Sequence, residues 1–422
     1  MATDLDLHVD GLCVVDTHEH LNPPGLYPDQ EHDPLRLLFD NYFAHDLVSA
    51  GATPGQVHDE LFNPGFGGVA ERFAVVAPFW ERAQHTGYGR AVKIMARDLF
   101  GIERVGVETM GALEAAARAL TSDPDWRLRL LRDRANLDHV QCDRFDNADE
   151  PAEPDKGFFR SDISWVWNSR GEVDFGRLMA RTGVEVTGAA SAREAIAEQF
   201  RREAPGAVAL KSQHAYARTL LWANRTDAEV EALIERRLRG EDLVGDDRLV
   251  LGDWMFARGI EGATDHGLPV KIHTGYLAGN GGLWPTQISP SNLGPLLVGF
   301  PEARFVLMHV GYPEPGQVVQ LAKHYRNTWI DMCWAWSIDP VTSRGFVASA
   351  LAAVPANKIL AFGGDSLWAT ASYAYSVQAR RELAGVLGTL VADGTFDEGE
   401  AIGIATRLLR ENALDLFPTP GL

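Results

Sequence analysis

The chain has 422 residues, of which 45% are hydrophobic and 23% are charged, a balance typical of a globular protein with a large core. Its formal net charge of −19 argues against a nucleic-acid partner, because phosphate neutralisation needs clustered Lys and Arg. No apolar run is long enough to span a membrane, the N-terminus does not resemble a signal peptide, and the three cysteines are far apart. We therefore expect no membrane partner, no disulfide framework and a cytoplasmic location.

Short runs rich in Val, Ile and Leu recur along the chain, and helical patterns lie between the later ones. Nearly continuous apolar strands are typical of a parallel sheet buried on both faces. Eight such runs alternating with helices predict the α/β class and a (β/α)₈ TIM barrel. Helical patterns are clearest at residues 191–203, 227–240, 250–267 and 315–325. The expected strands are residues 11–16, 137–143, 162–168, 206–211, 269–273, 304–309, 328–332 and 358–365.

The connection between the first two expected strands is unusually long. A structureless loop over residues 17–136 would be out of place in a compact domain. Segments such as RAVKIMARDLFG and LEAAARAL have helical patterns, so we predict a helical insertion over residues 25–136 within a single barrel domain, residues 1–422. In a TIM barrel the active site lies at the C-terminal ends of the strands, where such an insertion would act as a cap.

Several expected strands end in residues that bind metals. The segment VVDTHEHL places His18 and His20 two positions apart, so both imidazoles would lie on one face of a continuing strand. Later strands end in His273, His309 and Asp365, and all strand ends of a parallel barrel meet at one rim. A lone strand-end histidine is more often structural. The set together suits a divalent ion such as zinc, with one position left for water.

The segments VVDTHEHL, VKIHTGY, FVLMHVGYP and AFGGDS together resemble the signature of the amidohydrolase superfamily, the metal-dependent (β/α)₈ hydrolases. With ALKSQHAYAR and the long insertion, the chain is most similar to the amidohydrolase-2 branch, which holds mononuclear-metal decarboxylases and hydrolases and is similar to the uronate isomerases. The resemblance implies His18, His20, His273 and Asp365 as ligands of a divalent metal. Zinc is the first expectation, and manganese, iron and nickel are alternatives. The resemblance also implies that Asp365 is the general base and that His309 orients the substrate or polarises its carbonyl.

A second set of residues is predicted to bind substrate. Lys211 has three interpretations: a free amine that holds a substrate carboxylate, a carboxylated bridge between two ions, or a structural salt bridge. Arg218 is either a clamp for an acid group or a solvated helix cation. Tyr216 lies on the same segment, and Trp284 and Trp334 join the set because aromatic faces suit sugars and planar rings.

The expected function is that of a metal-dependent hydrolase that uses metal-activated water on a small polar substrate, carboxylate-like or sugar-like. A decarboxylase or a uronate-type isomerase on the same barrel is the alternative. A catalytically inactive barrel used as a binding protein is the non-enzyme alternative. Such a protein would be expected to have lost a metal ligand, and none of the set is missing from this sequence. A serine or cysteine nucleophile is not supported, because no GxSxG elbow occurs and Cys333 lacks an evident partner base. The expected partner is a small-molecule substrate. Whether the chain forms a homo-oligomer is left open by the sequence.

Overall fold

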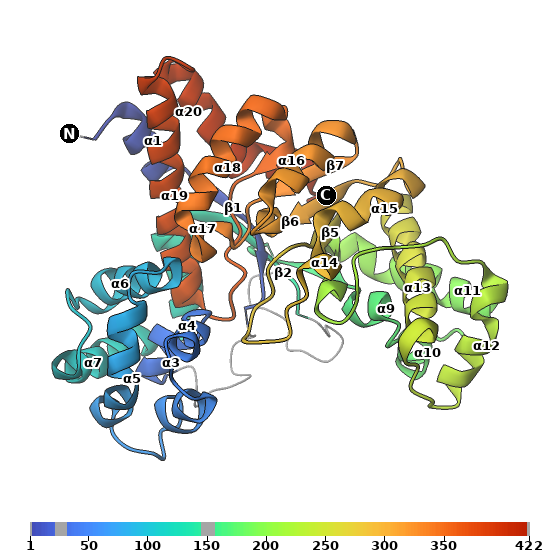
Figure 1. The fold of residues 1–422 in the computed structure, drawn as a ribbon, viewed down its shortest axis with the longest axis horizontal. Helices are drawn as coiled ribbons and strands as arrows, with labels where there is room; N and C mark the ends of the chain where they lie inside the picture. The colour runs from blue at the N-terminus through green and yellow to red at the C-terminus, as the bar shows by residue number, and fades with distance from the viewer. Residues whose placement is uncertain (1, 22–31, 145–156, 420–422) are drawn as a thin grey trace.

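The computed structural model of the chain describes residues 2–21, 32–144 and 157–419. Eight strands form one sheet in the order β1 to β8, and each pairs in parallel with the next (Figure 1). The predicted (β/α)₈ barrel is therefore confirmed. The strands are β1 (Val14–Glu19), β2 (Leu137–Cys142), β3 (Phe159–Ser164), β4 (Ala207–Ser212), β5 (Val270–His273), β6 (Phe305–Met308), β7 (Thr328–Asp331) and β8 (Ile359–Leu360).

Backbone hydrogen bonds join β1 to the segment that follows β8. The Thr17 amide donates to the Phe362 carbonyl at 3.1 Å, and the Asp365 amide donates to the His18 carbonyl at 2.9 Å. The His20 amide then donates to the Ser366 carbonyl at 3.0 Å. These bonds bring the first strand beside the last, and they place the residues after β8 next to the histidines of β1.

Three strands differ from the sequence prediction by more than one residue at either end. β1 begins later than expected because the residues up to Gly11 belong to helix α1 (Asp4–Gly11). β3 begins and ends earlier, and the expected strand end at residues 166–168 lies in α9 (Val166–Arg170), since the buried Trp165 turns away to pack on Phe200. β8 is reduced to two residues because the chain beyond it bends towards the first strand.

A group of helices fills the long connection between β1 and β2, as predicted. The expected start of this insertion at residue 25 lies outside the described residues. Helix α6 (Gly87–Phe100) packs against α17 (Ala335–Ile338) and α19 (Ala369–Ala392). A Cβ on Gly87 would collide with the Ser337 carbonyl, so the contact requires glycine. The insertion is formed by α3 (Pro34–Phe39), α4 (Phe43–Ser49), η1 (Gln56–Leu61), α5 (Val69–Ala83), α6 (Gly87–Phe100), η2 (Val107–Thr109), α7 (Met110–Thr121), α8 (Trp126–Leu128) and η3 (Arg129–Arg134) (blue and cyan in Figure 1).

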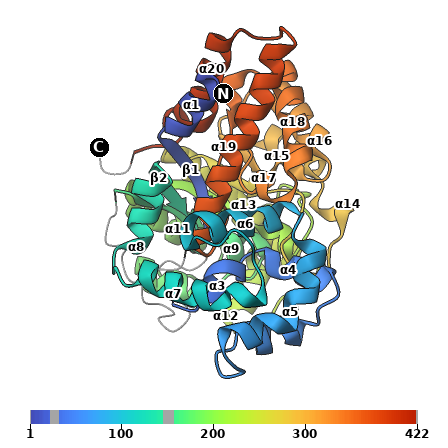
Figure 2. The ribbon, with the colours of Figure 1, turned by 90° about the vertical axis from the view of Figure 1, so that its left-hand side faces the viewer.

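The helices expected from the later patterns are confirmed as α11 (Ala189–Glu203), α12 (Asp227–Leu238), α13 (Gly245–Asp265) and α16 (Pro315–His324). In Figure 2, α1, α19 and α20 lie together, far from α5. Among the described residues, no helix is both long and apolar enough to cross a membrane. The remaining elements are α10 (Phe175–Thr182), η4 (Ala204–Gly206), η5 (His214–Tyr216), α14 (Pro285–Ile288), η6 (Pro290–Leu293), α15 (Gly294–Gly299), η7 (His309–Gly311), α17 (Ala335–Ile338), α18 (Pro340–Ala353), η8 (Ala356–Lys358), α19 (Ala369–Ala392), α20 (Glu398–Thr406), η9 (Arg407–Glu411) and α21 (Asn412–Leu416).

A buried ion pair crosses the barrel interior. The Lys271 ammonium on β5 donates to both carboxylate oxygens of Asp162 on β3, at 2.9 and 2.8 Å, and to the Thr17 carbonyl at 2.8 Å. Both side chains are fully buried. Burial raises the pKa of Asp162 to about 6, and the charge of Lys271 opposes that rise. The pair therefore links three strands, and neither charge has water to replace its partner.

We expect Lys271→Met to lower the free energy of unfolding by roughly 3–5 kcal/mol at pH 8, because it removes the cation that is bonded to the buried Asp162 carboxylate. Without Lys271 the pKa of Asp162 rises further, so the loss is present above that pKa and shrinks as the pH falls below it. Urea denaturation of the wild type and the variant at pH 8 and pH 5.5 measures both effects. Lys271→Met combined with Asp162→Leu should recover most of the loss. Equal stability of Lys271→Met and the wild type at pH 8 would contradict this account.

Candidate metal centre

The structure brings the predicted strand-end residues to one rim of the barrel. His18 lies within β1 and His20 directly follows it, while His273 ends β5. His309 directly follows β6, and Asp365 lies in the segment after β8. All are buried except His20, which is partly exposed. The meeting of these side chains follows from the parallel arrangement of the strands.

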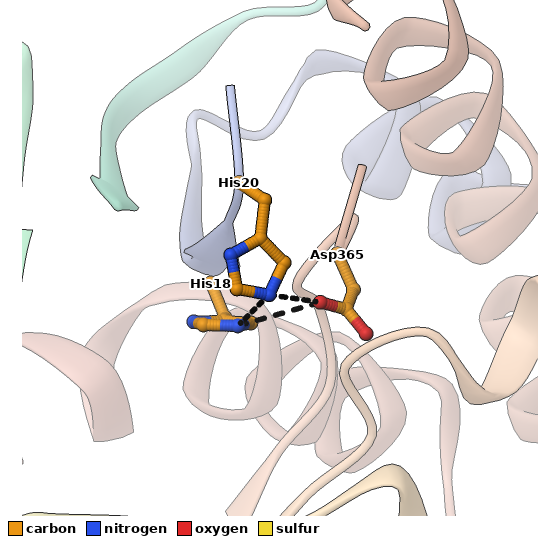
Figure 3. A group of neighbouring side chains, drawn as sticks. All are labelled: His18, His20 and Asp365. Carbon is orange, nitrogen blue, oxygen red and sulfur yellow. Dashed lines mark hydrogen bonds and ion pairs between the residues drawn. The ribbon is translucent and has the colours of Figure 1, made fainter. Parts of the chain in front are cut away.

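Three donor atoms form a nearly equilateral triangle (Figure 3). The Nε2 atoms of His18 and His20 are 3.3 Å apart, and each lies 3.3 Å from Oδ1 of Asp365. Ligand atoms bonded to one Zn²⁺ at about 2.0 Å are about 3.3 Å apart in a tetrahedral site. The three donor atoms therefore have the spacing that a single divalent ion requires.

Hydrogen bonds orient the two histidines of this triangle. Nδ1 of His20 donates to the Asp143 carbonyl at 2.6 Å, which leaves the lone pair of Nε2 facing Asp365. The Gln213 amide donates to the Asp143 carboxylate at 3.1 Å and lies 3.4 Å from His20 Nε2. Burial and the charge of Lys211 hold the pKa of His18 well below its usual range, so its ring is neutral, as a metal ligand must be.

Asp365 is held in an unusual backbone conformation. Its φ of 54° is left-handed, and a Cβ on the preceding Gly364 would collide with the Glu19 carboxylate, which explains the glycine. His309, Val310 and Trp334 also have positive φ, so four of the five non-glycine residues with positive φ in the described ranges lie at this rim. Such conformations cluster at functional sites, where the surrounding structure holds them.

Two buried acids, Asp16 and Glu19, accept hydrogen bonds from the backbone around His18 and Asp365. Asp16 accepts hydrogen bonds from the amides of His18 and Gly364, at 3.1 and 3.2 Å, and Glu19 accepts from the Ser366 amide. Burial raises the pKa of Asp16 to about 7 and that of Glu19 well above its usual range. A hydrogen bond joins the two side chains, so at neutral pH the pair holds a proton. The pair fixes the backbone that presents His18 and Asp365.

His309 faces the second oxygen of Asp365. Its Nδ1 donates to the Cys333 carbonyl at 3.0 Å, and its Nε2 lies 3.8 Å from Asp365 Oδ2. This buried Nε2 has no hydrogen-bond partner among the described residues. Burial and the neighbouring His273 hold the pKa of His309 well below its usual range. The ring is therefore neutral with a free lone pair, which can accept a hydrogen bond from a substrate hydroxyl but cannot donate one to a carbonyl.

His273 lies close to the triangle without joining it. Its Nε2 donates to the Tyr276 carbonyl at 2.8 Å, and its ring centre is 4.3 Å from that of His309. The ligand atoms within 4.8 Å of one another belong to His18, His20 and Asp365, and a second such group joins His309 and Cys333 to Asp365. The assignment of His273 as a ligand stays a prediction.

Lys211 lies beside the same donors. Its buried Nζ is 3.0 Å from Nε2 of His18, so the amine is bonded to the lone pair that a metal would take. No carboxylate lies within ion-pair distance of this amine among the described residues, which does not favour the salt-bridge interpretation. The free amine and the carboxylated bridge remain the two interpretations.

The predicted substrate-binding residues divide into two groups. Tyr216 and Trp334 lie at the site: the Tyr216 ring centre is 4.9 Å from His273, and that of Trp334 is 5.4 Å from His309. Trp284 is 66% exposed on the loop after β5. Arg218 lies apart, because its buried guanidinium donates to Asp253 on α13 and to backbone carbonyls.

The structure also adds residues that the sequence analysis did not single out. Tyr42, between α3 and α4 of the insertion, donates a hydrogen bond to Asp365, and its ring is 4.5 Å from Trp334. Burial raises the pKa of Asp365, and the charges of His20 and Lys211 oppose that rise, as Tyr42 does. Asp143 directly follows β2, so the strand-end rule would have found it. Nothing in the local sequence marks Tyr42.

A family model described as "Amidohydrolase" matches residues 171–419. The chain belongs to this amidohydrolase family. A curated relative, protein fluG of Emericella nidulans, is 25% identical over 176 residues, which are 40% of this chain and only 20% of that protein. The family match and the donor set together support a divalent metal and an enzyme of the amidohydrolase fold.

Solved structures share the whole fold at low identity. A glucuronate isomerase from Caulobacter crescentus is 18% identical with a TM-score of 0.76, and the match covers 99% of this chain and 94% of that one. A uronate isomerase from Thermotoga maritima is 14% identical with a TM-score of 0.75, over 98% of this chain and 96% of that one. At this identity the similarity concerns the fold, including the insertion.

We expect His18→Ala to abolish metal binding, because it removes one corner of the triangle. The sequence alone predicts the same loss for His273→Ala, whereas the geometry predicts that this variant keeps the ion with an affinity about 10–100-fold lower, as for a supporting residue. Elemental analysis after dialysis against graded metal concentrations distinguishes these outcomes, with exposed His324→Ala as the control. Equal loss in both variants would make His273 a ligand, and retention in both would refute the site.

Proposed function

We propose that the protein is a metal-dependent hydrolase that acts on a small polar substrate with carboxylate or sugar-like groups. The observation that carries the proposal is the triangle of His18, His20 and Asp365 donor atoms at 3.3 Å, with the second carboxylate oxygen of Asp365 left outside it. A ligand set of this size leaves room for water and substrate. The spacing suits zinc, and manganese, iron or nickel could use the same donors.

A divalent ion held by these residues would supply Lewis-acid chemistry, polarising a substrate carbonyl and making water more acidic. Asp365 Oδ1 faces the two imidazoles, so Oδ2 is the oxygen that can accept a proton from water and return it to the leaving group. His309 Nε2 is 3.8 Å from this oxygen and is free to accept a hydrogen bond from a substrate hydroxyl. Trp334 and Tyr42 cover the same side and exclude water.

Isomerisation of a sugar acid is the second candidate, and decarboxylation uses the same parts. Isomerisation is favoured by the position of Asp365 Oδ2 beside the His309 Nε2 lone pair. Two proton acceptors side by side could move a proton between neighbouring carbons of a substrate. The fold similarity to a glucuronate isomerase from Caulobacter crescentus is compatible with it.

The test combines metal content with a substrate screen. We expect about one ion per chain, and turnover of sugar lactones or N-acylated acids by the zinc-loaded or manganese-loaded protein. Asp365→Asn, assayed at saturating metal, should lower kcat by roughly 10²–10⁴-fold, because it removes the proton acceptor. Asp242→Asn is the matched control, since the Asp242 side chain is 95% exposed.

Turnover of uronates to their keto isomers without hydrolysis would replace the proposal by the second candidate. Turnover that Asp365→Asn leaves unchanged would refute the assigned role of Asp365. Failure to bind any divalent ion would refute both functions.

A further inference from the structure

Arg170 is a cation at the rim that the metal centre does not use. It ends α9, directly after β3, and is partly buried. It lies against Gln213, the residue that directly follows β4. The guanidinium therefore lies at the wall formed by the segments after β4 and β5, which the hydrogen bond between Tyr216 and Ala278 joins.

The hydrogen bonds of Arg170 leave much of its guanidinium unused. Its Nη2 donates to the Gln213 carbonyl at 3.3 Å, and its Nε is buried without a hydrogen-bond partner in the described ranges. Its Cζ atom lies over the Trp167 ring, at 5.1 Å from the ring centre, and this contact fixes the orientation of the planar guanidinium. No carboxylate of the described residues is within ion-pair distance of Arg170. The neighbouring Glu172 pairs with Arg248 at 3.1 Å.

Arg218, the arginine that the sequence analysis singled out, shows the contrast. Its guanidinium is buried against Asp253 and donates to the Ser169, Leu221 and Leu249 carbonyls. It has no donor left for a ligand. Arg170 keeps a buried, unpaired donor, and a partly desolvated guanidinium in this state gains most from an anion that offers two oxygens.

Tyr216 provides a second donor on the same wall. Its hydroxyl oxygen accepts a hydrogen bond from the Ala278 amide at 3.0 Å, so the hydroxyl hydrogen is free to donate. The Tyr216 backbone amide donates to the Gln213 carbonyl at 3.4 Å, and Arg170 donates to the same carbonyl, so the two residues are neighbours. Burial raises the pKa of the Tyr216 hydroxyl. The hydroxyl therefore stays protonated over the working pH range.

We infer that Arg170 and Tyr216 form the subsite that binds a carboxylate group of the substrate. The inference rests on the proposed function and gives it a substrate class: small acids whose carboxylate lies at one end and whose reacting group lies at the other. Gln213 sets this separation. Its carbonyl accepts from Arg170, while its side-chain amide lies 3.4 Å from His20 Nε2, so one glutamine residue spans the distance between subsite and metal centre.

The experiment compares acids with their neutral analogues on the metal-loaded protein. Isothermal titration calorimetry with D-glucuronate against D-glucose, and with benzoate against benzyl alcohol, measures the preference for the acid. We expect the wild type to bind at least one acid at least tenfold more tightly than its neutral analogue. Arg170→Gln should remove this preference and change the affinity for the neutral compound less than twofold. Arg170→Lys should restore it in part, and Tyr216→Phe should weaken it less than Arg170→Gln does.

Arg326→Gln is the control for net charge, because the Arg326 side chain is 86% exposed. Metal content is measured for every variant, so a loss of the ion, which would count against the proposed function, is separated from a loss of acid binding. An unchanged preference in Arg170→Gln would mean that the carboxylate binds the metal or Lys211 instead, and would overturn the inference. A wild type without any preference for either acid would also overturn it.

Discussion

Barrel closure is the constraint on which the site depends. The bonds from the Asp365 amide to the His18 carbonyl and from the His20 amide to the Ser366 carbonyl join the two ends of a chain segment of more than 340 residues. They place three donor atoms within 3.3 Å of one another. A metal triangle built from both ends of the barrel therefore exists only when the whole sheet is formed.

The interior around this closure is polar to an unusual degree for a barrel core. Asp16 and Glu19 share a proton, Lys271 pairs with Asp162, and the Thr17 hydroxyl donates to Asp331 at 2.8 Å. Each of these contacts ends on β1 or on a strand that faces it. Such groups cost free energy to bury, but once they are all bonded they permit few alternative packings. The strain at Asp365 and His309 is held by this network, and the donor geometry is thereby preorganised.

Much of the fold was predictable from the sequence, because buried strands and amphipathic helices leave strong periodic patterns. The order of eight strands and the long insertion followed from those patterns. The limits of β3 and β8 did not, since Trp165 and the Gly-Gly-Asp turn end their strands through contacts with distant segments. His18, His20 and Asp365 were found because parallel strand ends must converge. The sequence could not show that Arg218 is bonded within the fold while Arg170 keeps an unused donor. The partner of Arg218 is Asp253, which lies 35 positions further along the chain.

The contact between Lys211 and His18 has a consequence for how the protein selects its ion. The amine is bonded to the same nitrogen that a cation needs, so a cation that binds His18 has to displace the amine. The bond between the ion and the imidazole must therefore be strong enough to offset the loss of the Lys211–His18 hydrogen bond. Ions high in the Irving–Williams order bind imidazole strongly, whereas Mg²⁺ prefers oxygen ligands and holds its water tightly. Displacing the amine is therefore easier for a transition-metal ion than for Mg²⁺.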